Sequence, residues 1–67
     1  MKDIAVDLIS FELGELDDSE TLELFAYLVE TGMAWNLQGA YGRAAQRLID
    51  LGLISEAGEV TPEVLAA

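Results

Sequence analysis

The sequence contains neither cysteine nor histidine, and it has only one proline and three basic residues in 67 positions. Without cysteine the chain forms no disulfide bond and offers no thiolate to a metal ion, which fits a reducing cytoplasm. Without histidine it lacks the commonest general base and the commonest metal ligand. We therefore expect a cytoplasmic protein that is not an enzyme and that binds neither a metal ion nor an organic cofactor.

Long hydrophobic runs are also missing. The longest stretch without a charged residue, residues 31–42, contains three glycines, an asparagine and a glutamine, whereas a membrane-spanning helix needs about 20 mostly apolar residues. The chain start has one lysine followed at once by acids and then by no small-residue cleavage site, which is not the pattern of a signal peptide. We expect neither a membrane segment nor a secretion signal.

Acidic residues outnumber basic ones by 13 to 3, which gives a formal net charge of −10. Nine of the acids lie in residues 1–30, where Lys2 is the only base. Proteins bind nucleic acids and anionic membranes through basic patches, so direct binding to either is not expected. A partner protein with a basic surface is electrostatically favoured.

Hydrophobic residues make up 52% of the chain, which excludes a disordered acidic tail. The length allows a single domain, residues 1–67, with a thin hydrophobic core. Apolar residues recur at helical spacing, so the sequence predicts an all-α fold. We expect a compact three-helix domain with a possible short C-terminal fourth helix, which would begin at Thr61-Pro62-Glu63.

The first predicted helix covers residues 3 to about 13 and ends at Gly14. Its apolar residues spread over an unusually wide arc and leave a narrow polar stripe of Asp3, Asp7 and Ser10. The second helix starts with a capping box in which Asp17 and Glu20 satisfy each other's backbone amides. Its predicted inner face is Leu22, Phe25, Ala26, Val29 and Met33, and it ends at Gly32.

The third predicted helix runs from about residue 40 to residue 51 and ends at Gly52. Its predicted inner face is Tyr41, Ala44, Ala45 and Leu48. Residues 33–38 form either a short helical turn or an irregular connection, and a turn is predicted at residues 55–58.

The acids around the first two helices are candidate interaction residues: Asp7, Glu12, Glu15, Asp17, Asp18, Glu20 and Glu23. Their spacing does not match a calcium-binding EF-hand, which needs alternating ligands, a central glycine and a late glutamate. We interpret most of them as helix caps and solvated charges. Arg43 and Arg47 are further candidates, although two arginines in so acidic a chain are expected to act as internal counter-ions.

Residues 35–43 form the most unusual segment, because they contain the only tryptophan, one of two tyrosines and two glycines. One interpretation is an anion site, formed by Arg43 and the free amides of a helix start. The favoured interpretation is structural: aromatic rings fill the core and glycines let helices approach closely. The candidate structural residues are Trp35, Gln38, Gly39, Tyr41 and Gly42. On this interpretation Trp35 is largely buried and packs near Phe25 and Tyr41.

Four segments resemble a family of very small proteins encoded by tailed bacteriophages. They are Gly14-Glu15-Leu16, Glu23-Leu24-Phe25, the run Thr31-Gly32-Met33-Ala34-Trp35-Asn36-Leu37-Gln38-Gly39-Ala40-Tyr41-Gly42-Arg43, and Leu48-Ile49 with Gly52. The resemblance implies a phage source and carries over no catalytic residue. A weaker similarity to winged helix-turn-helix domains rests on Leu51-Gly52-Leu53-Ile54 and the Val-Thr-Pro that follows. The wing of such a domain would carry Glu56 and Glu59, where DNA binding needs lysine or arginine. A domain of this shape would therefore bind a protein.

These observations favour a phage accessory protein that binds a host or phage protein in the host cytoplasm. One alternative is an acidic mimic that blocks a DNA- or RNA-binding protein, and another is a minor structural or assembly protein of the virion. The apolar excess of the first helix also predicts self-association, most simply as a two-fold dimer in which Asp3, Asp7 and Ser10 face outward. Otherwise a different protein covers the same patch.

Overall fold

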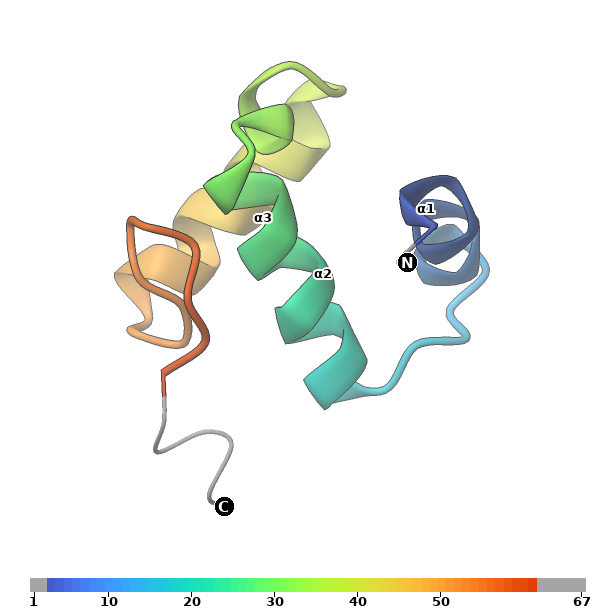
Figure 1. The fold of residues 1–67 in the computed structure, drawn as a ribbon, viewed down its shortest axis with the longest axis horizontal. Coiled ribbons are helices and arrows are strands. Elements are labelled where there is room, and N and C mark those ends of the chain that lie inside the picture. Colours follow the sequence, from blue (N-terminus) through green and yellow to red (C-terminus); the bar gives the residue numbers. More distant parts are fainter. Residues whose placement is uncertain (1–2, 62–67) are drawn as a thin grey trace.

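The computed structural model describes residues 3–61. This part of the chain forms α1 (Ile4–Glu12), α2 (Asp18–Glu30), the single 3₁₀ turn η1 (Met33–Trp35) and α3 (Gly39–Asp50). The predicted all-α, three-helix fold is therefore confirmed. In Figure 1, α2 lies between α1 on one side and α3 on the other. The predicted fourth helix falls on residues 62–67, outside the described residues.

Local sequence signals define the helix ends. The Asp3 carboxylate accepts hydrogen bonds from the backbone N–H groups of Ala5 and Val6 and thereby caps α1. The capping box of α2 is present: the Asp17 side chain accepts from the Glu20 N–H at 2.7 Å, and the Glu20 side chain accepts from the Asp17 N–H at 3.1 Å. Gly14, Gly32 and Gly52 all have positive φ angles just after the helices, where glycine carries no steric penalty. The predicted starts and stops are thus confirmed.

The hydrophobic core is centred on α2. Leu22, Phe25, Ala26 and Val29 are buried as predicted, and Met33 is half-buried. Leu24 and Leu28 are also buried, although they lie off the predicted inner face. A helix enclosed on several sides buries most of its circumference, so a single apolar stripe underestimates its buried face. None of the helices in residues 3–61 is long and apolar enough to cross a bilayer.

Three aromatic rings join the three helices. Phe11 of α1 packs edge-on against Phe25 of α2 with 5.2 Å between ring centroids. Tyr41 of α3 lies 6.0 Å from Phe11 and 6.2 Å from Phe25. The Tyr41 hydroxyl donates a 2.8 Å hydrogen bond to the carboxylate of Glu12, at the end of α1. Tyr41 therefore connects α3 to both other helices.

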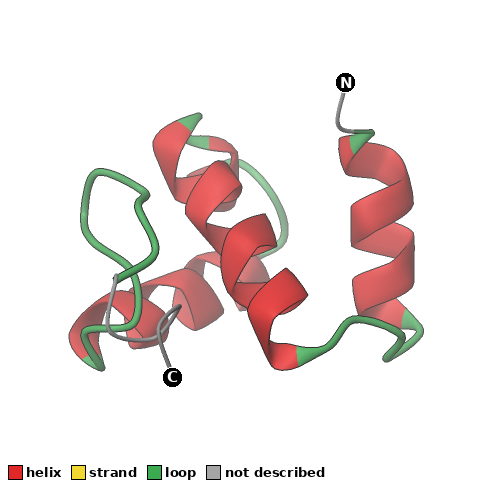
Figure 2. Cartoon of the chain, turned by 60° about the horizontal axis from the view of Figure 1, so that its bottom comes forward, coloured by secondary structure: helices red, strands yellow, loops and turns green. Residues whose placement is uncertain are grey.

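A tight loop follows α3 and packs back onto α2 (Figure 2). Ile54 and Val60 form an isolated antiparallel bridge, and the Ser55 N–H donates to the Glu59 carbonyl at 2.8 Å. Ile54 is buried in the core. Gly58, with φ of +87°, lies so close to α2 that a Cβ there would be 2.5 Å from the backbone nitrogen of Glu30. The predicted turn is present, and its contact with α2 fixes the loop in place.

Candidate interaction surface

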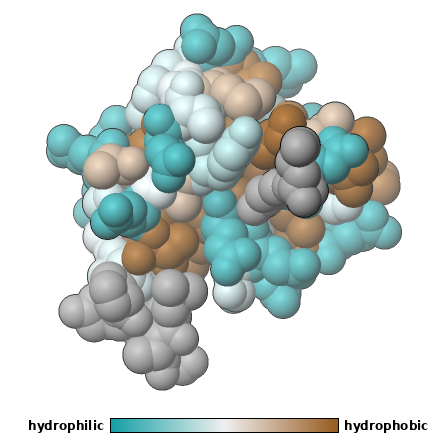
Figure 3. All heavy atoms as spheres, viewed as in Figure 1, coloured by the Kyte–Doolittle hydropathy of each residue, from teal (hydrophilic) through white to brown (hydrophobic). Residues whose placement is uncertain are grey.

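The inner face of α1 packs against α2, whereas its outer face is exposed. Ile4, Leu8 and Phe11 contact the core, but α1 contributes no fully buried residue. On the opposite side Val6, Ile9 and Leu13 are 54%, 57% and 67% exposed. We call these three residues, Val6 and Ile9 of α1 and Leu13 at its C-cap, the α1 ridge. They occur at positions i, i+3 and i+7 and so lie along one helix face. Figure 3 shows apolar atoms on α1, at the right of the view, beside hydrophilic ones.

Next to the ridge, α1 and the start of α2 border an open depression of about 320 Å³. We call it the acidic depression, and its lining residues are Asp3, Val6, Asp7, Leu16, Glu20 and Glu23. Four of these six side chains are carboxylates, and Val6 also belongs to the ridge. The ridge and the depression therefore form one continuous surface.

The fold brings together only some of the candidate acids. Asp7, Glu20 and Glu23 line the depression, while Glu12, Glu15, Asp17 and Asp18 do not. The expectation that Asp3, Asp7 and Ser10 face outward holds for Asp3 alone, because Asp7 and Ser10 are half-buried.

The remaining acids have local roles or lie in solvent. Asp17 caps α2, and Glu12 accepts the hydrogen bond of Tyr41. Burial raises the pKa of Tyr41 above its ordinary value, and the hydrogen bond and negative charge of Glu12 raise it further. Glu15 and Asp18 are exposed. Among residues 3–61, no group of three or more acidic side chains is arranged to hold a metal ion.

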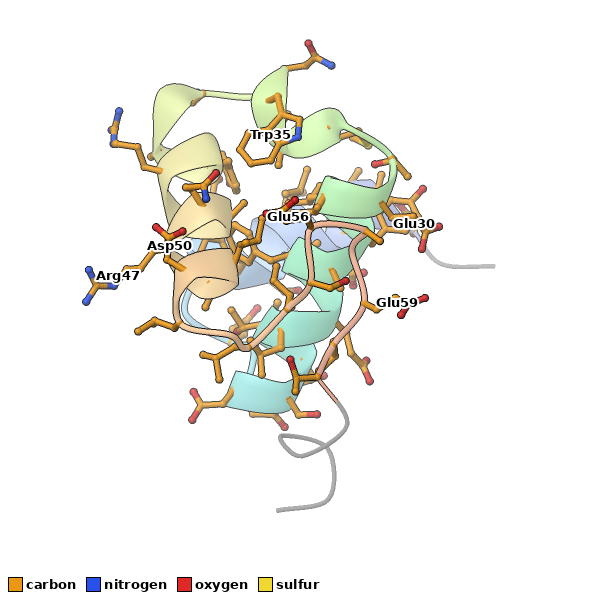
Figure 4. All side chains as sticks on the ribbon, turned by 90° about the vertical axis from the view of Figure 1, so that its left-hand side faces the viewer. Glu30, Trp35, Arg47, Asp50, Glu56 and Glu59 are labelled. Atoms are coloured by element: carbon orange, nitrogen blue, oxygen red, sulfur yellow. The ribbon has the colours of Figure 1, made fainter. Side chains whose placement is uncertain are left out.

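Arg43 and Arg47 lie on the exposed face of α3, away from the acidic depression. They line a second open depression, of about 370 Å³, with Gln46, Asp50 and Leu51. The Asp50 carboxylate accepts a hydrogen bond from the Gln46 amide at 3.0 Å. Arg47 points away from the protein in Figure 4. Asp50 lines the same depression as both arginines, and their predicted role as internal counter-ions stays a prediction.

The Trp35–Arg43 segment is structural in part. Trp35 is 52% exposed and lies outside the aromatic cluster, so its predicted burial beside Phe25 and Tyr41 was wrong. The η1 turn buries Ala34 and leaves the indole on the surface beside α3 (Figure 4). Gly42 allows this close packing, because a Cβ there would lie 3.3 Å from the Ala34 carbonyl oxygen.

The other residues of this segment have different surroundings. Tyr41 is buried as predicted. Gln38 precedes α3 without a side-chain capping bond. A Cβ at Gly39 would meet the Arg43 guanidinium at 3.0 Å, so Gly39 faces a flexible side chain of its own helix. The close helix approach predicted for both glycines is confirmed only for Gly42.

The exposed ridge has a visible signal in the sequence, namely the wide apolar arc of residues 3–13. The acidic depression has a weaker one, because Asp3 and Asp7 are four residues apart on one predicted helix and Glu20 and Glu23 are three apart on the next. Each pair shares a helix face, but the packing of the two helices decides that the pairs meet.

Comparison with known proteins gives a family without an assigned activity. No curated protein and no solved structure matches the chain. A family model described as a domain of unknown function matches residues 1–67, the whole of the chain. The protein therefore belongs to the DUF7417 family.

Proposed function

We propose that this protein acts by binding another protein through the α1 ridge and catalyses no reaction. The observation that carries the proposal is the exposure of three large aliphatic side chains along one face of α1 and its C-cap. Contiguous exposed apolar surface on a small protein commonly marks an interaction site. Covering it with a partner removes apolar area from water, which favours association.

The arrangement of the ridge suits a grooved partner. Amphipathic helices that bind in grooves anchor themselves through residues at i, i+3, i+4 and i+7, and Val6, Ile9 and Leu13 supply three of these positions. The nine residues of α1 span about 14 Å at 1.5 Å per residue. A groove that receives the exposed face of so short a helix contacts more of that face than a flat partner would.

The phage origin inferred from the resemblance gives the binding a context. We propose that the protein is a phage accessory protein, made in the host cytoplasm, whose partner is a host or phage protein. A small domain with an exposed apolar helix face suits such a role, because the role requires a binding surface and no reaction centre.

The test is affinity purification of the tagged protein from cells that express its gene, followed by mass spectrometry. The double variant Ile9→Gln and Leu13→Gln removes two ridge side chains and places a good helix former at position 9 of α1 and at its C-cap. Leu51→Gln is the matched control, because Leu51 is 60% exposed at the end of α3. One protein should be recovered in stoichiometric amounts with the wild type and the control, and lost with the double variant. Equal recovery with all three forms would refute the ridge as the binding surface.

A second candidate function is nucleic-acid mimicry, favoured by the exposure of Glu12, Glu15, Asp17, Asp18 and Glu20 on one half of the chain. A mimic presents carboxylates in place of phosphates, so its binding weakens steeply as salt is added. It also predicts a partner that normally binds DNA or RNA. Under this alternative the ridge variants bind as well as the wild type, whereas charge-removing variants do not.

A further inference from the structure

We propose that the partner of the α1 ridge carries a lysine or arginine at the edge of its apolar groove, and that this side chain enters the acidic depression. The inference rests on the proposed function and specifies the chemistry of the partner. Val6 belongs to both the ridge and the depression. A partner that covers Val6 therefore also reaches the depression.

The lining of the depression suits a long cationic side chain. Asp3, Glu20 and Glu23 are exposed at its rim, and no basic residue is among the described residues that line it. Val6 and Leu16 add apolar wall. Lysine and arginine place aliphatic stems on apolar surface while their charged ends reach polar groups. Valine and leucine would contact the stem, and the carboxylates would bind the charged end.

Charge also selects a different protein over a second copy of this chain. Two copies joined through their ridges would bring two acidic depressions close together, and each chain carries a formal charge of −10. Like charges placed together at an interface oppose association. A groove bordered by basic residues replaces this repulsion with attraction, so the occupant we infer is a basic-rimmed apolar groove.

The first experiment uses synthetic amphipathic peptides as probes, observed through the amide resonances of the ¹⁵N-labelled wild-type protein. One peptide has leucine on one helical face and lysine on its flanks; in two others, glutamine or glutamate replaces every lysine. The leucine–lysine peptide should shift amides of α1 and the first turns of α2, and bind about tenfold more tightly than the leucine–glutamine peptide. The leucine–glutamate peptide should not bind measurably.

Matched variants locate the charge effect. Glu20→Gln with Glu23→Gln removes two carboxylates from the depression, and glutamine at position 20 still completes the capping box. Glu56→Gln with Glu59→Gln removes the same charge from the loop after α3, where both side chains lie in Figure 4. The first pair should weaken the leucine–lysine peptide about tenfold, and the second pair less than twofold.

Each outcome separates this inference from the proposed function. If the two pairs of variants weaken binding equally, or if the leucine–glutamine peptide binds as tightly as the lysine form, the cationic partner is wrong while ridge binding stands. If Ile9→Gln with Leu13→Gln leaves the affinity for the leucine–lysine peptide unchanged, the ridge itself is wrong. Sedimentation equilibrium of the protein alone should give the monomer mass, and a dimer abolished by the same ridge variant would make a second copy the occupant.

Discussion

Tyr41 joins the three helices through one ring and one hydroxyl group. Its ring packs against Phe11 and Phe25, and its hydroxyl binds the carboxylate of Glu12. Because the phenol is buried beside a negative charge, the pKa of Tyr41 is raised and its neutral form is favoured in the folded protein.

Replacing Tyr41 by phenylalanine should therefore lower the free energy of unfolding by about 1 kcal/mol near neutral pH, because one hydrogen bond is lost and the ring is kept. The raised pKa adds a pH dependence. The stability that comes from the raised pKa of Tyr41 is fully present below the pKa of tyrosine in the unfolded chain, about 10. This stability is lost as the pH rises through the higher pKa of Tyr41 in the folded protein. Urea denaturation of both proteins at pH 8 and above pH 10 checks this. An alkaline loss of stability that is equal in Tyr41→Phe would exclude Tyr41 as its source.

Trp35 gives a second prediction at this scale. The indole is half-exposed beside α3, so its fluorescence maximum should lie between those of buried and fully hydrated tryptophan, and acrylamide should quench it readily. Trp35→Ala should cost about 1–2 kcal/mol, below the ~3–5 kcal/mol typical of a buried tryptophan. A strongly blue-shifted emission protected from the quencher would contradict the exposed position.

Residue burial could be predicted from the sequence where helical periodicity applies. Phe25 and Tyr41 lie within regular helices, and both are buried as expected. Trp35 lies in a 3₁₀ turn, whose side chains follow a different period. Its orientation depends on how η1 packs on Gly42, which no local pattern encodes.

The helices themselves were predictable because their end signals are local. The capping box of α2 and the glycines after each helix act within a few residues. The placement of the loop at residues 54–60 was not predictable, since it depends on contact between Gly58 and α2, more than 25 positions earlier in the chain.

Two glycine substitutions measure that contact. Gly52→Ala and Gly58→Ala both place a side chain at a positive φ, but space around Gly52 is open while Gly58 abuts Ala26 and Glu30. Gly52→Ala should cost about 1–2 kcal/mol from backbone strain alone. Gly58→Ala should cost a further 1–3 kcal/mol or so from overpacking. Comparing chemical denaturation of the two variants isolates the contact, and equal losses would show that the loop does not press on α2.

The loose attachment of α1 gives a prediction for a whole element. Since α1 has no fully buried residue and α2 has six, local opening of α1 should require less free energy. Amide hydrogen exchange in the free protein should therefore be faster in α1 than in the middle of α2. Equal protection of both helices would mean that α1 opens only when the whole protein unfolds.

At the scale of the whole molecule, the excess of acids governs the response to pH and salt. Thirteen acidic residues against three basic ones give a formal net charge of −10, so the carboxylates repel one another at neutral pH. Partial protonation relieves that repulsion, so the melting temperature should hold or rise slightly from pH 7 to pH 5. Thermal denaturation followed by circular dichroism checks this, and a steep loss of stability already at pH 5.5 would show that favourable carboxylate interactions dominate.

The candidate surface was also predictable in part. The apolar excess of the first helix indicated exposed apolar surface, and the acidic first half of the sequence indicated a charged neighbour. The exact surface was not predictable, because the two acid pairs meet only when α1 packs beside the start of α2. That packing depends on contacts of Ile4, Leu8 and Phe11 with residues distant in sequence.

The central claim is that a partner covers α1. It is tested most directly by comparing amide hydrogen exchange in the free protein with exchange in its complex with the co-purified partner. The account predicts strong new protection in residues 4–13 and at the start of α2, with little change on the exposed face of α3 or in residues 54–60. Protection confined to α3 or to residues 54–60, with α1 exchanging as in the free protein, would contradict it.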